Sequence, residues 1–234
     1  MLWVCIPFVF LFPFFYYFLK TGNFDRVFKL KRVWTRIILT CSFLFPVIEY
    51  KSQKYKMPGP CVIVSNHSSY LDITISPLYI DHTAAYLGKS ELLKVFLFRS
   101  FFLFLDIPVD RKSLTGSHKA FLKAGERIEQ GISIVIYPEG TISERGKLRP
   151  FKKGAFKLAI EKQVPIVPVV NLNNWWFLQN GGYFKSNGRP GIPRIIVGDP
   201  IETKGLTQQN IGELKQKVFN FTQTELDKFY GGQN

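Results

Sequence analysis

The chain has 234 residues, of which 46% are hydrophobic, and a formal charge of +14. This length suffices for one well-buried domain plus an appendage, and this composition excludes a disordered chain. The charge fits nucleic acid, an anionic membrane surface or an anionic small substrate as a partner. Half of the excess lies in residues 1–56, beside apolar segments. Because no recognised nucleic-acid motif accompanies these cations, we expect no nucleic-acid partner.

The first element, Leu2–Leu19, is an uncharged run with nine aromatic residues. As a helix it would extend about 27 Å, just short of a bilayer core of about 30 Å. Pro7 and Pro13 would kink this helix, and aromatic residues favour the interface between lipid and water. The pattern predicts either a short span or a helix lying in the interface.

The next two elements continue this N-terminal segment. Thr21–Arg36 interleaves apolar and basic residues, which predicts an amphipathic helix on anionic headgroups. Ile37–Ile48 is too short to span and is expected to re-enter or to pack. We therefore interpret residues 1–56 as a membrane-anchoring helical hairpin whose basic flank faces the cytoplasm, at the cell membrane or an inner membrane. The alternative is a pair of buried helices in a soluble protein.

Beyond Lys56, short β-branched runs alternate with longer helical stretches. The expected strands are Cys61–Ser65, Ala84–Leu87, Ser133–Tyr137, Val164–Val170 and Arg194–Val197, and the expected helices are Leu71–Ile80, Glu91–Phe104, Ser113–Gln130, Lys152–Lys162 and Gln208–Phe229. This alternation predicts an α/β catalytic domain over 57–234, with a mixed, largely parallel sheet flanked by helices. Ligands bind beyond the carboxyl ends of strands in such sheets, where 66–67 and 138–140 fall.

The stretch NHSSYLD, residues 66–72, has two interpretations. Ser69 and Asp72 fit the start of an ordinary helix, with a carboxylate in the first turn. Alternatively, His67 is a general base and Asp72 holds its tautomer. Residues five apart on one helix differ by about 140° in azimuth, so this second interpretation requires His67 in the turn before the helix.

A covalent nucleophile is not expected. The chain contains no G-x-S-x-G sequence, and Cys61 lies within an apolar strand, where a thiolate is disfavoured. Cys5, Cys41 and Cys61 show neither metal-ligand spacing nor a disulfide framework, so we expect reduced thiols and no metal site. The chemistry predicted is direct attack by a substrate hydroxyl that His67 activates.

Three further blocks follow NHSSYLD in order: IPVDR at 107–111, YPEGT at 137–141 and VPIVPV at 164–169. With His67 and Asp72, this ordered set resembles the glycerolipid acyltransferase family, the relatives of 1-acylglycerol-3-phosphate acyltransferase, over roughly 58–170. The N-terminal hairpin is similar to the family's membrane-anchoring helices.

The resemblance implies that a thioester, on coenzyme A or acyl carrier protein, acylates a lipid hydroxyl without a further cofactor. It implies that His67 is the base and that Asp72 orients it. Residues implied in holding the acceptor or shaping the acyl path are Lys89, Asp110, Arg111, Glu139, Gly140, Thr141 and Pro165.

One position departs from the family pattern. Ile142 stands where arginine usually follows E-G-T and contributes to phosphate binding. Phosphate recognition is then expected from Arg111, from Lys89, or from a cationic cluster. The cluster consists of Arg145, Lys147, Arg149, Lys152 and Lys153. The leading hypothesis is synthesis of phosphatidic acid. The alternatives are acylation of another lysolipid, such as a lyso-amino-acid lipid, and a catalytically silent lipid-binding protein of the same fold.

Overall fold

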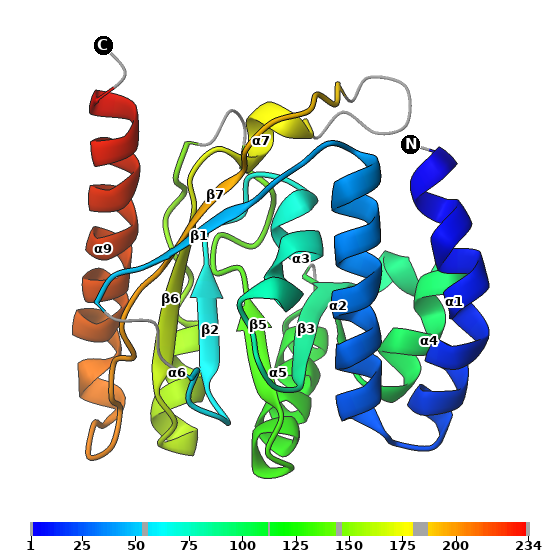
Figure 1. Ribbon diagram of the computed structural model, residues 1–234. Helices are drawn as coiled ribbons and strands as arrows, with labels where there is room; N and C mark the ends of the chain where they lie inside the picture. The colour runs from blue at the N-terminus through cyan, green and yellow to red at the C-terminus, as the bar shows by residue number, and fades with distance from the viewer. Residues whose placement is uncertain (1, 53–55, 112, 144–146, 180–186, 233–234) are drawn as a thin grey trace.

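The computed structural model describes residues 2–52, 56–111, 113–143, 147–179 and 187–232. A seven-stranded sheet with the order β1-β7-β6-β2-β5-β3-β4 forms the centre, and helices cover both of its faces (Figure 1). The strands are β1 Val47–Tyr50, β2 Val62–Ser65, β3 Ala84–Lys89, β4 Ile107–Val109, β5 Ser133–Ile136, β6 Ile166–Asn171 and β7 Arg194–Val197. The α-helices are α1 Leu2–Lys20, α2 Phe24–Cys41, α3 Leu71–Ile75, α4 Phe96–Phe104, α5 Leu114–Glu129, α6 Gly154–Lys162, α7 Asn174–Phe177 and α9 Ile211–Gly231. Among the described residues, the 3₁₀ turns Ser76–Leu78, Ser90–Lys94 and Gln208–Asn210 lie next to helices.

The central strands are buried on both faces. Every residue of β2, β5 and β6 is buried, and β2 pairs in parallel with both of the other two. Continuous apolar strands of this kind are typical of parallel sheets covered by helices. Strand β7 runs antiparallel to β6, and β1 runs parallel to β7. The predicted mixed, largely parallel sheet is therefore confirmed.

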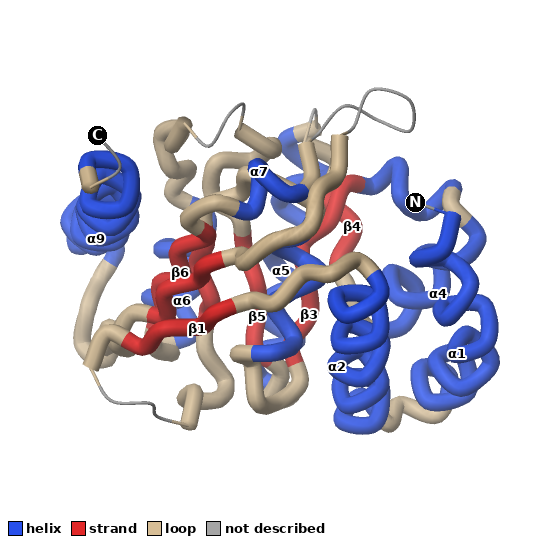
Figure 2. Tube along the Cα trace, turned by 45° about the horizontal axis from the view of Figure 1, so that its top comes forward, coloured by secondary structure: helices blue, strands red, loops and turns tan. Residues whose placement is uncertain are grey.

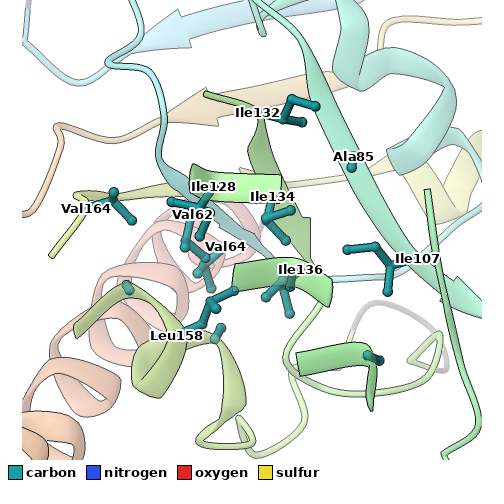
Figure 3. Packing of buried hydrophobic residues seen from close by; sticks show 14 of the residues in the cluster. Val62, Val64, Ala85, Ile107, Ile128, Ile132, Ile134, Ile136, Leu158 and Val164 are labelled. Carbon is teal, nitrogen blue, oxygen red and sulfur yellow. The ribbon is translucent and has the colours of Figure 1, made fainter. Parts of the chain in front are cut away.

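Alternate residues of each central strand enter different cores, as the period of two requires. Figure 3 shows Val62, Val64, Ile134 and Ile136 directed toward Leu158 of α6. Ile63 of the same β2 strand lies in the opposite core, with residues of α2 and α3. The two cores fix β2 and β5 firmly, and with them the loops that follow these strands.

The two N-terminal helices pack against one side of this domain, beside α4 (Figure 1). Aromatic rings join the two helices to each other and to α4. The ring centroids of Phe8 in α1 and Trp34 in α2 are 5.0 Å apart, and those of Phe15 in α1 and Phe101 in α4 are 5.2 Å apart. In the part of the chain that the structure describes, no helix has the combined length and hydropathy needed to cross a bilayer. Strand β1 comes from the same N-terminal segment, and the boundary expected at residue 56 stays a prediction.

A buried ion pair also joins α2 to the domain. Lys31 Nζ lies 3.7 Å from the Asp106 carboxylate and faces the rings of Tyr86 and Phe101. Burial lowers the pKa of Lys31 and raises that of Asp106, and the attraction between the two charges opposes both shifts. Such a pair is costly to break, because either partner alone is an uncompensated buried charge.

Several elements differ from the sequence expectations. The expected helix Glu91–Phe104 is divided into a 3₁₀ turn, Ser90–Lys94, and α4, with Val95 extended between them. The expected helix 71–80 ends at Ile75, because Pro77 lacks an N–H and a 3₁₀ turn follows. Strands β1 and β4 were not predicted. Both are short edge strands, and Pro108 within β4 is tolerated because of that edge position.

Candidate active site

His67 and Asp72 meet at the carboxyl edge of the sheet. Strand β2 ends at Ser65, His67 occupies the following turn, and Asp72 lies in the first turn of α3. His67 Nδ1 is 2.9 Å from Asp72 Oδ2. The Asp72 side chain is fully buried, and 9% of the His67 side chain is exposed. The turn-then-helix placement that the functional interpretation required is therefore present.

The Asp72 carboxylate accepts four N–H groups. Oδ2 accepts from the backbone N–H groups of Ser68 at 2.7 Å and Ser69 at 2.9 Å, as well as facing His67. Oδ1 accepts from Asn174 Nδ2 at 2.8 Å. Since Oδ2 already accepts two amides, we assign the proton of the His67–Asp72 bond to Nδ1. Nε2 is then the basic nitrogen of the ring.

Three further contacts hold the His67 residue in place. Its ring stacks on Tyr137, with 4.1 Å between centroids and 24° between planes. Its backbone N–H donates to Glu139 Oε1 at 2.7 Å, and its carbonyl accepts from the N–H of Ser143 at 2.7 Å. Loops after β2 and β5 thus fix one imidazole together, which is the rigidity that a positioned base requires.

Glu139 connects two loops through its buried carboxylate. One oxygen accepts the N–H of His67, and the other accepts the N–H of Arg149 at 3.0 Å. Burial raises the pKa of Glu139 to about 7, and the two amide hydrogen bonds oppose this rise. Both oxygens are directed at backbone, so the geometry supports a positioning role. Its expected role in holding an acceptor stays a prediction.

Two cations approach the E-G-T turn. The Arg111 guanidinium donates to the carbonyl of Gly140, which has a φ of 77°. Lys152 lies so close that a Cβ at position 140 would be 2.8 Å from its Nζ. A side chain here would be strained and would displace Lys152, which explains the glycine. Thr141 is exposed beside them.

A cavity of about 190 Å³ opens next to these cations. Arg111, Lys152 and Gly140 border it together with Tyr137, whose ring stacks on His67. The rest of the wall is mostly apolar and comes from the sheet and from α5 and α6. Small residues of the two helices leave the space open: Ala120, Ala124, Gly154 and Ala155.

The other residues that were expected at the site lie in different parts of the sheet. Lys89 ends β3 and forms an exposed ion pair with Glu91 at 3.1 Å. Asp110 directly follows β4 and is exposed. Pro165 precedes β6 beside the start of β2, at the end of the sheet opposite His67, so the structure does not bring it to the site. Arg145 lies outside the described residues.

Asparagines that were not predicted from the sequence support the Asp72 carboxylate. Asn174 Nδ2 donates to Asp72 and also to Asn171 Oδ1 at 3.0 Å. Asn171 and Asn66 exchange backbone and side-chain hydrogen bonds at 2.8 and 2.9 Å. The sequence feature that could have indicated these asparagines is NLNN, residues 171–174, at the carboxyl end of the expected strand 164–170.

Cys61 is excluded as a nucleophile by its surroundings. It is fully buried, and burial raises the pKa of its thiol to about 12. A thiolate is therefore scarce there at neutral pH. The geometry of the His67–Asp72 pair is accordingly suited to the activation of an external hydroxyl, the chemistry that acyl transfer requires.

Comparison with known proteins identifies the class. The model of the family described as Acyltransferase matches residues 47–171, and the chain belongs to that family. The human 1-acyl-sn-glycerol-3-phosphate acyltransferase beta is 35% identical over 163 residues, which are 66% of this chain and 55% of the human protein. The 1-acyl-sn-glycerol-3-phosphate acyltransferase of Haemophilus influenzae is 33% identical over 69% of this chain and 66% of its own length.

The fold also has a solved counterpart. The crystal structure of the 1-acyl-sn-glycerophosphate (LPA) acyltransferase PlsC from Thermotoga maritima matches with a TM-score of 0.73. The match covers 97% of this chain and 98% of the PlsC chain at 23% sequence identity, which shows a shared fold. The chain spans 55% and 58% of the human relative and of a similar Caenorhabditis elegans protein.

Proposed function

We propose that this protein transfers a fatty acyl group from a thioester to the free hydroxyl of 1-acylglycerol-3-phosphate, which yields phosphatidic acid. The observation that carries the proposal is the His67–Asp72 pair, 2.9 Å apart and supported by Asn174. The names of the relatives above favour this acceptor.

The proposed reaction uses one imidazole twice. Nε2 of His67 takes the proton of the acceptor hydroxyl as its oxygen attacks the thioester carbonyl. Asp72 stabilises the imidazolium that forms. Collapse of the tetrahedral intermediate breaks the carbon–sulfur bond, and the imidazolium returns the proton to the leaving thiolate. The products are an ester and a free thiol, and the proposed reaction uses no metal or further cofactor.

Arg111 and Lys152 are proposed to bind the phosphate of the acceptor. Both approach Gly140 in the turn that begins with Glu139, near where Ile142 replaces the family's usual arginine. Two cations at one turn can neutralise a phosphomonoester through charge-assisted hydrogen bonds. This pair would replace the missing guanidinium.

The cavity beside Tyr137 is proposed to hold the acyl chain of the donor. It is largely apolar, it borders the residue that stacks on the base, and the two cations lie at its rim. Whether coenzyme A or acyl carrier protein supplies the thioester is left to the assay. The aromatic and basic hairpin supports a membrane location, proposed to be at the cytoplasmic face.

The test uses the purified full chain with a labelled acyl thioester and a panel of lysolipids. His67→Ala should lose about 10²–10⁴-fold in kcat, the usual contribution of a general base. Equal turnover by this variant would refute the base assignment, and absence of turnover by the native protein on every lysolipid would favour the silent lipid-binding alternative. Turnover only with acceptors that lack a phosphomonoester would favour another lysolipid as substrate.

A second arm tests the phosphate site. Lys152→Gln should raise KM for the phosphomonoester acceptor at least about tenfold, since a charge-assisted bond contributes about 1.5–3 kcal/mol. Lys153→Gln, an exposed neighbour, is the matched control. Similar effects of both substitutions would contradict the assignment.

A further inference from the structure

Helix α7 carries Asn174, whose side chain donates to Asp72, yet this helix is only four residues long. Figure 2 shows α7 as a short helical segment between loops. Isolated helices shorter than about 12 residues are marginal in water, because the first turn is costly to form. The N-cap residue, Asn173, makes no capping hydrogen bond through its side chain among the described residues. The position of Asn174 therefore depends on contacts that other parts of the fold make with α7.

One tyrosine hydroxyl, from the last turn of α9, joins the two flanks of Asn174. Tyr230 OH accepts from Trp175 Nε1 at 2.9 Å and donates to the carbonyl of Leu172 at 2.6 Å. Burial raises the pKa of Tyr230, and the hydrogen bond from Trp175 opposes this rise. The hydroxyl therefore keeps at neutral pH the proton that it donates. It bridges the residue that precedes Asn173 and the residue that follows Asn174.

Aromatic rings pack around this bridge. The ring of Trp176 in α7 lies 5.6 Å from that of Phe229 and 6.1 Å from that of Tyr230, measured between centroids. At the end of α7, Phe177 is buried in the core that also contains residues of α2 and α3. Figure 1 shows the C-terminal end of α9 at the same edge of the sheet as α7. Helix α7 is thus held between α9 and that core.

Helix α9 is itself fixed to the sheet. Leu226 lies in a small core with Val170 of β6 and Ile196 of β7. The buried carboxylate of Glu225 pairs at 2.8 Å with Lys51, which directly follows β1. A helix fixed by burial and by an ion pair is a rigid support, and rigid support is what a positioned catalytic group requires.

Asn174, Trp175 and Tyr230 all follow residue 171, where the match to the family ends. We infer that Tyr230 is a positioning residue for acyl transfer. Its hydroxyl holds α7 so that the Asn174 amide meets the Asp72 carboxylate. The carboxylate, held on that side, keeps the imidazole of His67 aligned. The inference rests on the proposed function only in assigning the chemistry to His67.

The experiment compares Tyr230→Phe with Thr222→Val in the full chain. Both substitutions remove one hydroxyl of α9, but Thr222 donates within the helix, to the carbonyl of Val218 at 2.9 Å. Tyr230→Phe keeps the ring and should lower kcat about tenfold, the value of about one hydrogen bond. KM for the acceptor should change less than about twofold, because a misplaced catalytic group impairs turnover more than binding. Thr222→Val should keep both constants within about twofold of the native values.

Two further measurements separate positioning from stability. Trp175→Phe, which removes the donor to the same hydroxyl, should lower kcat as Tyr230→Phe does. In an Asn174→Ala background, Tyr230→Phe should lower kcat no further, because the hydroxyl acts through that amide. The downfield NMR resonance of the His67 Nδ1–H proton, recorded without substrate, should move upfield and broaden in Tyr230→Phe and stay in place in Thr222→Val.

Native kcat in Tyr230→Phe, an equal loss in Thr222→Val, or additive losses with Asn174→Ala would overturn the inference. An unchanged His67 resonance in Tyr230→Phe would also overturn it. If the native chain turned over no lysolipid, the proposed function would fail, and the resonance would still decide whether Tyr230 positions the His67–Asp72 pair.

Discussion

Replacing Asp72 with asparagine tests the proposed role of this acid without removing its hydrogen bonds. An asparagine oxygen can accept the three N–H groups of His67, Ser68 and Ser69 that meet Oδ2. Its amide would then face Asn174. Flipping the Asn174 amide lets Oδ1, which has no partner among the described residues, accept from it, but gives up the donation from Asn174 Nδ2 to Asn171 Oδ1. The tautomer of His67 is kept in this arrangement. The substitution removes one negative charge and costs about 1–3 kcal/mol in altered hydrogen bonds.

The magnitude follows from that charge. Spread over the imidazolium ring and the carboxylate, the two charges are about 4 Å apart, and their attraction at an effective dielectric constant near 20 is about 4 kcal/mol. This attraction exists only once His67 holds the proton, so its loss falls on the transition state and lowers kcat/KM about 10³-fold. We expect this loss in initial-rate measurements with lysophosphatidic acid and an acyl thioester.

A double-mutant cycle gives the decisive control. In a His67→Ala background, Asp72→Asn should cost nothing further, because Asp72 acts through the imidazole. Circular dichroism and thermal unfolding would verify the fold of each variant. Retention of more than a tenth of the native kcat/KM by Asp72→Asn, or additive losses in the double variant, would refute the reasoning.

Three other predictions follow from buried groups. The pKa of Glu139 is raised from 4.5 to about 7. As pH rises between these values, the free energy of unfolding of the native protein should therefore fall relative to that of Glu139→Gln, as measured by urea titrations. A difference in unfolding free energy that does not change with pH would contradict this prediction. Lys31→Met should cost about 3–5 kcal/mol, because Asp106 is left buried and charged, and adding Asp106→Asn should recover most of the loss. Ala124→Phe should fill the cavity and shift donor preference toward shorter acyl chains, whereas Leu122→Phe, exposed on the same helix, should not.

Much of the fold was predictable because the central strands are simple. Runs such as VIVS and SIVI are too short for helices and too apolar for loops, and burial from both faces leaves strands as the only consistent assignment. Strand β1 was not predictable in this way. Its exposure alternates weakly, and its pairing with β7 joins residues about 147 positions apart, which no local pattern encodes.

The candidate site was predictable where its contacts are local. His67 and Asp72 are five residues apart, and helix geometry alone required the histidine to precede the helix. The two interpretations of this stretch proved compatible, since Asp72 binds the N–H of Ser69 as a helix-start carboxylate does and also binds His67. Asn174 reaches Asp72 across 102 positions. Only the fold reveals that contact, and likewise the direction of the Glu139 carboxylate toward backbone.

The edge strand β1 has a practical consequence for how the N-terminal helices can be studied. Cutting the chain at residue 56 would strip β1 from β7, uncover a row of unpaired backbone groups and remove the cation that neutralises Asp106. Deletion would therefore yield an aggregating fragment instead of a detached soluble enzyme. Because the hairpin packs against the domain, its position relative to His67 is set when the protein folds and not by a hinge.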